Sequence, residues 1–266
     1  MDESVPRNEA ICLERMLQAA QAAVQRILPI YADAQRWQLR YKADASPLTL
    51  ADRQSHDCIC AGLAGLGYPV ISEEMEVLPA CAPEGRYFLL DPLDGTREFL
   101  AGNGEFTVNI ALIEDGRPLL AVIAVPADGR LFHAQRGQGA WQGRQRLRVQ
   151  PVSRVLRVGV SRHHGQGEGE ALAAAALGLD LRMVARGSSL KMVDIATGEL
   201  DFCLRLGPTM AWDTAAAQLL LEEAGGGLYD LHGEALVYRG PWRNPGFFAT
   251  ALSVSDSLAL LSLDHS

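Results

Sequence analysis

Acidic side chains gather in four short segments of the sequence, each beside a predicted strand or helix. The residues concerned are Asp52, Glu73 and Glu74, Asp91 and Asp94, and Asp213. Taken singly, each is explained by a helix cap or a solvated acid, and Asp213 in particular by an N-cap. Four of these carboxylates would repel one another if they met in one cleft, namely those of Glu73, Asp91, Asp94 and Asp213. Two Mg²⁺ ions would neutralise such a cluster, hold a phosphate and polarise a water for in-line attack.

The hexapeptide Asp-Pro-Leu-Asp-Gly-Thr, which begins at Asp91, is the most informative of these segments. An apolar strand leads into Asp91 and Asp94, and the proline fixes the backbone while the glycine frees it. We therefore expect a rigid turn that aims both carboxylates and the Leu93 carbonyl at one point, as oxygen ligands for Mg²⁺. Gly95 and Thr96 should then open a short helix whose free N–H groups receive a phosphate.

Three ordered motifs resemble the signatures of the inositol monophosphatase superfamily, a group of lithium-sensitive, Mg²⁺-dependent phosphatases. The motifs are Ser-Glu-Glu at residues 72–74, Asp-Pro-Leu-Asp-Gly-Thr-Arg-Glu-Phe at 91–99 and Trp-Asp-Thr-Ala-Ala at 212–216. The resemblance extends over residues 42–247. Within the superfamily, four further segments look closest to the bacterial CysQ-type 3′(2′),5′-bisphosphate nucleotidases. These segments are residues 103–111, 187–191, 207–209 and 244–247.

The resemblance implies that oxygen atoms from the three motifs hold two or three Mg²⁺ ions. The first ion would be bound by Glu73, Asp91 and the Leu93 carbonyl, and the second by Asp91, Asp94 and Asp213. The second ion would stabilise the ribose oxygen as it leaves. Li⁺ is expected to displace that second ion.

The resemblance also assigns roles to residues that meet the water and the substrate. Thr96 Oγ, together with Glu73 and the first metal, would position the attacking water, and Asp52 would orient Thr96. The N–H groups of Gly95 and Thr96 would face the phosphate. The substrate is expected to lie against a set of residues from these motifs: Leu93, Asp94, Gly95, Thr96 and Asp213.

The segment Gly187-Ser-Ser-Leu-Lys is the expected place for nucleotide specificity. The hydroxyls of Ser188 and Ser189 and the ammonium of Lys191 could meet the phosphate that is not cleaved. The alternative is a helix N-cap followed by a solvated lysine, and the sequence leaves both interpretations open.

The activity implied is hydrolysis of adenosine 3′,5′-bisphosphate to AMP and phosphate by a metal-activated water. The 3′-phosphate of phosphoadenylyl sulfate is a second candidate target, and sulfur assimilation is the process implied. Alternatives within the superfamily are an inositol monophosphatase or another sugar phosphatase. A catalytically silent nucleotide-binding relative is the alternative from another class, and the complete acid set with Thr96 argues against it.

Two other phosphoryl-transfer chemistries fit the sequence poorly. Haloacid-dehalogenase phosphatases need Asp-x-Asp, whereas the spacing here is Asp-x-x-Asp. The sequence contains no Gly-x-x-x-x-Gly-Lys-Ser/Thr loop, which excludes P-loop chemistry.

Composition limits the class of protein. The 266 residues are 48% hydrophobic and carry a formal net charge of −8, which suits a globular protein and argues against one that binds nucleic acid by charge alone. The resemblance implies a small-molecule nucleotide as the substrate and no nucleic acid polymer as a partner. No apolar run is long enough for an integral membrane segment. Five scattered cysteines predict reduced thiols and a cytoplasmic location. The resemblance leaves open a homodimer and peripheral attachment to the inner face of the bacterial inner membrane.

The hydrophobic pattern predicts two halves that form one compact two-lobed unit. Residues 1–153 should form an α+β half, with helices over 9–36 and 51–66 covering an antiparallel meander that includes strands 106–112, 119–125 and 131–134. Residues 154–266 should form an α/β half, with strands 155–160, 183–185 and 202–206 and helices 168–177, 188–196 and 214–224. The fold class expected from the resemblance is a layered αβαβα sandwich of the inositol monophosphatase and fructose-1,6-bisphosphatase type.

Overall fold

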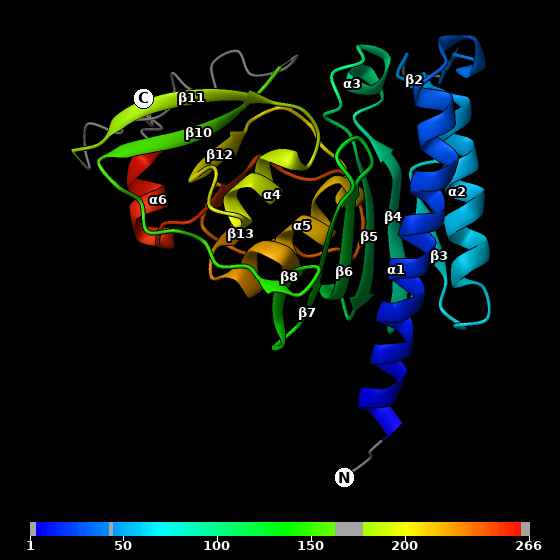
Figure 1. Cartoon of the computed structure of the whole chain (residues 1–266). Coiled ribbons are helices and arrows are strands. Elements are labelled where there is room, and N and C mark those ends of the chain that lie inside the picture. The colour runs from blue at the N-terminus through cyan, green and yellow to red at the C-terminus, as the bar shows by residue number, and fades with distance from the viewer. Residues whose placement is uncertain (1–3, 43–44, 163–177, 262–266) are drawn as a thin grey trace.

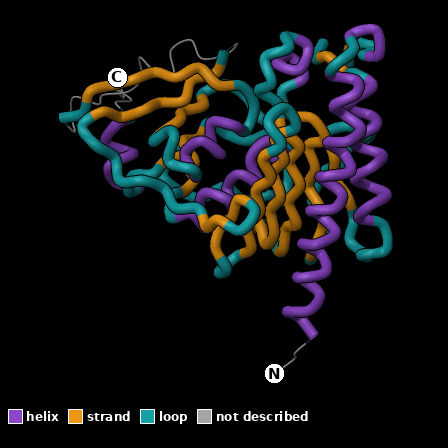
Figure 2. The backbone as a smooth tube through the Cα atoms, in the orientation of Figure 1, coloured by secondary structure: helices purple, strands orange, loops and turns teal. Residues whose placement is uncertain are grey.

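The computed structural model contains five layers, in which helices and sheets alternate (Figure 1). The structure describes residues 4–42, 45–162 and 178–261. Helices α1 and α2 form the first layer, α4 and α5 the third and α6 the fifth, with a sheet between successive helical layers (Figure 2). Their bounds are Ser4–Tyr31, Leu50–Leu63, Leu190–Ala196, Ala211–Ala224 and Val254–Leu260. The expected αβαβα sandwich is confirmed.

The larger sheet has seven strands in the order β3-β4-β5-β6-β7-β8-β9. Strands β4 to β9 pair antiparallel, as the alternating sequence pattern predicts, whereas β3 pairs parallel with β4. The short strands β8 and β9 were not predicted. The bounds in chain order are Val70–Ser72, Arg86–Asp94, Thr107–Glu114, Arg117–Val125, Arg130–Gln135, Gly139–Gln142 and Gln145–Arg146.

The smaller sheet has five strands in the order β11-β10-β12-β14-β13. Sequence patterns predict β10, β11 and β12 but not β13 and β14, two four-residue strands that pair antiparallel with each other. The bounds of β10 to β14 are Val155–Ser161, Asp180–Arg186, Phe202–Arg205, Gly227–Asp230 and Phe247–Thr250. The helix predicted over residues 168–177 lies outside the described residues.

Three small elements lie at the end of the molecule where the acidic motifs are found. Strands β1 (Arg40–Tyr41) and β2 (Pro47–Leu48) pair as an antiparallel ribbon, and α3 (Thr96–Leu100) lies beside β2 (Figure 1). The short helix beginning at Gly95 was predicted, and the structure places Gly95 as its N-cap.

Strand β5 is buried on both faces, which decides where its polar residues point. Ile110 belongs to the core formed with α1 and α2, whereas its neighbour Ala111 belongs to the core formed with α4 and α5. Because side chains alternate along a strand, Thr107 and Asn109 lie on the same face as Ala111. These two polar side chains therefore face the middle helices and not solvent, where an alternating pattern often places them.

The apolar pattern predicts the first helix over residues 9–36, and Pro29 predicts that this helix kinks or ends early. The helix ends at Tyr31 rather than residue 36, two residues after Pro29. A proline has no backbone N–H to donate and its ring crowds the preceding turn, so the helix ends within one turn after Pro29. Residues Ala34–Arg36 instead form a 3₁₀ turn, and the N–H of Gln35 donates to the Asp33 side chain.

The two sheets share the middle helical layer. Side chains of α5 pack in one core with residues of both sheets, including Leu89 of β4 and Phe247 of β14. The last strand of the larger sheet ends at Arg146 and the first strand of the smaller one begins at Val155. The division into halves 1–153 and 154–266 stays a prediction. None of the helices within the described ranges is both long and apolar enough to cross a membrane.

Because α5 joins both sheets, a cavity beside it should weaken the whole molecule. Leu219 lies fully buried in this shared core. Leu219→Ala should lower the free energy of unfolding by about 2–5 kcal/mol, the range for a buried leucine. The matched control is Leu181→Ala, because Leu181 is 38% exposed on edge strand β11. Urea unfolding of both variants tests this, and equal losses would contradict the central role of α5.

Candidate active site

A β-bulge in β4 positions the two aspartates of the hexapeptide. Asp91 lies opposite Asn109 of β5, and Asp94 lies opposite Thr107, so β4 holds one residue more than its partner over this stretch. An extra residue bends a strand and re-aims its side chains. The expected rigid turn after the strand is therefore corrected: the strand continues through Asp94 and the bulge does the aiming. The Leu93 N–H donates to Asp91 Oδ1 over 3.0 Å within it.

Asp52 joins helix α2 to the start of α3. Its Oδ2 accepts the Thr49 N–H over 2.7 Å and so caps α2, while its Oδ1 accepts the Thr96 hydroxyl over 3.1 Å. Asp52 is 2% exposed. Burial raises the pKa of Asp52, although hydrogen bonds from Thr49 and Thr96 oppose the rise. The contact that an orienting role for Asp52 requires is present, and the role itself stays a prediction.

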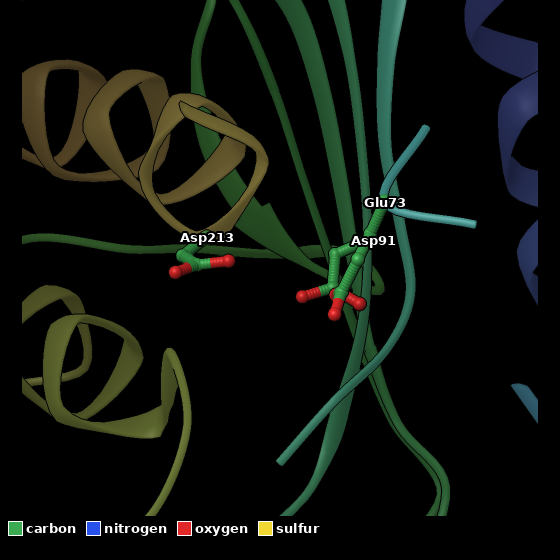
Figure 3. Close-up of side chains that lie close together, drawn as sticks. All are labelled: Glu73, Asp91 and Asp213. Atoms are coloured by element: carbon green, nitrogen blue, oxygen red, sulfur yellow. The ribbon is translucent and has the colours of Figure 1, made fainter. Parts of the chain in front are cut away.

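Three carboxylates from separate elements converge beside the bulge. Oxygen atoms of Glu73, Asp91 and Asp213 all lie within 4.8 Å of one another. Glu73 directly follows β3, Asp91 belongs to β4, and Asp213 reaches toward them from α5 (Figure 3). Asp213 is not the N-cap that a single-residue interpretation suggests. It is the third residue of α5, and its Oδ2 accepts the Met210 N–H over 2.8 Å.

The protein around these acids disfavours their charged forms. Burial raises the pKa of Asp91 well above its usual range, and the charges of Glu73, Asp94 and Asp213 raise it further. Removal from water likewise raises the pKa of Asp213, with Asp94 and Glu73 adding to the effect. Such a group of oxygens fits Mg²⁺, which prefers carboxylates and carbonyls and supplies the missing positive charge.

Asp94 lies at the edge of this cluster and is tied to the segment before α4. Its Oδ2 accepts the Ser189 N–H over 2.6 Å, with Thr107 Oγ1 at 3.5 Å and Asn109 Nδ2 at 3.4 Å. Burial raises the pKa of Asp94 to about 6, while the charge of Lys191 and the Ser189 N–H limit the rise. Asp94 thus links the acidic cluster to the segment expected to carry specificity.

A lysine that the sequence did not single out lies against the acids. Lys42 Nζ donates to Glu73 Oε1 over 2.9 Å and to Glu74 Oε1 over 2.8 Å. Burial raises the pKa of Glu74 to about 7, although the contact with Lys42 lowers it in part. Lys42 precedes Glu73 by 31 positions and Glu74 by 32 in the sequence, so spacing alone carries no signal for these contacts.

The segment Gly187–Lys191 matches neither expectation completely. The Ser189 hydroxyl faces Thr107 Oγ1 at 2.7 Å and Asn109 Oδ1 at 3.0 Å, and it makes no cap hydrogen bond to α4. Lys191 is 6% exposed, so the solvated lysine of the alternative interpretation is wrong. Its Nζ donates to the carbonyls of Ser188 and Arg186.

A cavity of about 210 Å³ opens beside the acidic cluster. Its lining includes Asp94, Gly95, Ser188, Lys191, Arg205 and Asp213. Arg205 was not predicted. It ends β12 and is 7% exposed, and it precedes the Gly207-Pro-Thr209 segment whose resemblance was noted. The cavity is therefore lined by two carboxylates of the acidic site, Asp94 and Asp213, and by two buried cations, Lys191 and Arg205.

Comparisons with known proteins identify the family of the chain. The inositol monophosphatase family matches residues 12–259. The 3′(2′),5′-bisphosphate nucleotidase CysQ of Salmonella typhimurium is 40% identical over 248 residues, covering 90% of this chain and 99% of that protein. The CysQ nucleotidase of Escherichia coli K12 is 38% identical over 250 residues, covering 88% and 98%.

The fold agrees as well. The crystal structure of CysQ from Bacteroides thetaiotaomicron, described as a bacterial member of the inositol monophosphatase family, superposes with a TM-score of 0.76. That protein is 32% identical, and the match covers 90% of this chain and 96% of that one. The resemblance inferred from the three acidic motifs is thus confirmed, and the chain belongs to the inositol monophosphatase family.

Proposed function

We propose that this protein is a Mg²⁺-dependent phosphatase that converts adenosine 3′,5′-bisphosphate to AMP and phosphate. The observation that carries the proposal is a cavity lined by Asp94 and Asp213, beside the converging carboxylates, and by the buried cations Lys191 and Arg205. A substrate with two phosphates on one small scaffold fits a lining that offers both metal ligands and fixed positive charge. The relatives named above as bisphosphate nucleotidases support the same substrate class.

The acids that converge are the proposed metal ligands. Glu73, Asp91 and the Leu93 carbonyl would hold one Mg²⁺. Asp91, Asp94 and Asp213 would hold a second, and the proposed number of ions is two or three. When bound, Mg²⁺ neutralises these carboxylates, polarises the phosphate and lowers the pKa of water. The mutual repulsion of Asp91 and Asp213 supports this assignment, because a cluster of that kind needs cations.

Thr96 is the proposed residue for orienting the attacking water. Its hydroxyl donates to Asp52 Oδ1, so the Thr96 oxygen keeps its lone pairs for a proton of the water. Glu73 would accept the other proton. Because Asp52 is fixed by the cap of α2, the direction of the Thr96 hydroxyl is fixed too.

The phosphate that is cleaved would lie against the N–H groups of Gly95 and Thr96. Gly95 has φ +95°, which a residue with a side chain adopts only with strain. The Ser188 hydroxyl, Lys191 and Arg205 would meet the phosphate that stays. The 3′-phosphate of phosphoadenylyl sulfate fits the same arrangement, and both reactions belong to sulfur assimilation. Residues of one chain line the cavity, so the proposal holds for a monomer or a homodimer.

The first prediction concerns substrate choice. Purified protein with Mg²⁺ should release phosphate faster from adenosine 3′,5′-bisphosphate than from inositol 1-phosphate. Asp94→Asn should lower kcat/KM by more than about a hundredfold, since changes behind the ligands alone cost up to that much. Asp128→Asn is the control, because Asp128 lies exposed in the turn between β6 and β7. Preference for the inositol ester would show that the protein acts on a different substrate of the same family. Nucleotide binding without phosphate release would indicate a catalytically silent relative.

The second prediction concerns the protein without metal. A carboxyl whose folded pKa is raised adds stability below about pH 4, its unfolded pKa, and loses that contribution as pH rises through the folded pKa. Asp91→Asn cannot ionise, so it avoids the loss of stability that ionisation of Asp91 causes as pH rises. It keeps the side-chain oxygen that accepts the Leu93 N–H. In EDTA, Asp91→Asn should therefore raise the melting temperature at neutral pH but not at acidic pH, by about 2–4 °C for each kcal/mol.

Thermal melts at both pH values with and without Mg²⁺ check this second prediction. Added Mg²⁺ should stabilise the wild-type protein more than Asp91→Asn. A variant that melts lower than the wild type in EDTA at neutral pH would show that the carboxylates do not repel one another in the folded state.

The third prediction concerns the second phosphate. Arg205→Gln removes a buried guanidinium from the cavity, and a contact of that kind to phosphate is strong. The KM for adenosine 3′,5′-bisphosphate should rise at least about tenfold, the effect of one charge-assisted hydrogen bond. The KM for inositol 1-phosphate, which has no second phosphate, should change little. Equal changes for both substrates would place Arg205 outside the second phosphate site.

A further inference from the structure

Glu105 connects the segment after α3 to the smaller sheet. Its Oε2 accepts Arg162 Nε over 2.6 Å and its Oε1 accepts Arg162 Nη2 over 2.7 Å, a two-pronged pair. The Gly187 N–H donates to Oε2 over 2.8 Å, and Arg186 Nη1 lies 3.5 Å from Oε1. One carboxylate thus holds the ends of β10 and β11 and the corner between β11 and α4.

This contact lies where the two proposed phosphate sites meet. A β-carbon at Gly95 would lie 3.1 Å from the Glu105 carbonyl oxygen and 3.2 Å from Ser188 Cβ. A β-carbon at Gly187 would lie 2.9 Å from the same carbonyl oxygen. The Glu105 main chain therefore lies beside both Gly95, proposed for the phosphate that is cleaved, and Gly187, which directly precedes Ser188, proposed for the phosphate that stays.

The corner that Glu105 holds has a backbone conformation that needs support. Ser188 has φ +48°, a left-handed conformation that serine adopts at a free-energy cost. On one side, Lys191 Nζ donates to the carbonyls of Arg186 and Ser188. On the other side, Glu105 accepts the Gly187 N–H. The corner is thus fixed between a buried ammonium and a carboxylate.

Glu105 is 13% exposed at its side chain and stays ionised. Burial would raise the pKa of Glu105, but hydrogen bonds from Arg162 and Gly187 lower it overall. A charge-assisted pair with two parallel hydrogen bonds fixes direction as well as distance. The contact is consequently suited to setting a geometry and not only to adding stability.

We propose that Glu105 is a positioning residue that sets the separation between the two phosphate sites and thereby the preference for a bisphosphate. The inference rests on the function proposed above. Glu105 itself touches neither phosphate. It acts through Gly187 and Ser188, whose place relative to Gly95 it determines.

Glu105→Gln tests this, because glutamine keeps the size but removes the charge. The KM for adenosine 3′,5′-bisphosphate should rise at least about tenfold, the size of effect that loss of a charge-assisted contact has. The inhibition constant of AMP should rise less, because AMP has one phosphate and does not span both sites. The kcat for the bisphosphate should stay within about twofold, and so should kcat/KM for inositol 1-phosphate, because the metal ligands and Thr96 are not displaced. A defect of folding or of metal binding would instead lower kcat for both substrates.

Glu114→Gln is the matched control. Glu114, at the other end of β5, also accepts from two arginines, with Arg86 at 2.7 Å and Arg136 at 3.3 Å, but it lies away from the cavity. This variant should leave all four constants unchanged. If Glu114→Gln raises the KM for the bisphosphate as much as Glu105→Gln does, the positioning role is wrong.

Arg162→Gln provides a second variant in case Glu105→Gln folds poorly. It removes the two shortest contacts to Glu105 and leaves the Gly187 hydrogen bond. The KM for the bisphosphate should therefore rise as well, but by less than in Glu105→Gln. Unchanged KM in both variants, with a wild type that prefers the bisphosphate, would overturn the proposal for Glu105 alone. A wild type without that preference would overturn the proposed function and this inference together, before any variant is measured.

Discussion

Electrostatic repulsion among converging carboxylates is the constraint around which this structure is organised. Glu73, Asp91 and Asp213 approach one another only because three elements force them to do so. The bulge in β4, the end of β3 and the start of α5 belong to two layers that share one core. The favourable burial of that core offsets the repulsion. The acidic cluster is therefore an electrostatically unfavourable arrangement that the surrounding fold maintains, which supports its proposed role as a cation site.

The same constraint explains why the site is built from so many buried hydrogen bonds. Asp52 fixes Thr96, and Asp94 is fixed by the Ser189 N–H. Each bond fixes the direction of one side chain in the site. Lys42 supplies positive charge beside Glu73 and Glu74. Fixed carboxylates and fixed cations are thus brought together within one small region of the fold.

The sequence predicted the elements whose pattern is local. The alternation through Phe106 to Leu112 predicts β5, and the order of the three acidic motifs predicts the family. The sequence did not predict contacts between distant segments. Lys42 contacts Glu73 from 31 positions earlier in the sequence, and Arg205 enters the cavity only because β12 ends there. The hexapeptide that begins at Asp91 predicts a turn, whereas the structure has a β-bulge there, because a proline and a glycine are compatible with both.

The buried strand β5 has a consequence for how the site responds to its ligands. Thr107 and Asn109, which flank Asp94, belong to a strand covered by helices on both sides. Amide hydrogens in such a strand exchange only when the whole core opens. The side chains that steer Asp94 are consequently ordered during folding, and binding of a cation or a nucleotide has little conformational entropy left to remove from them.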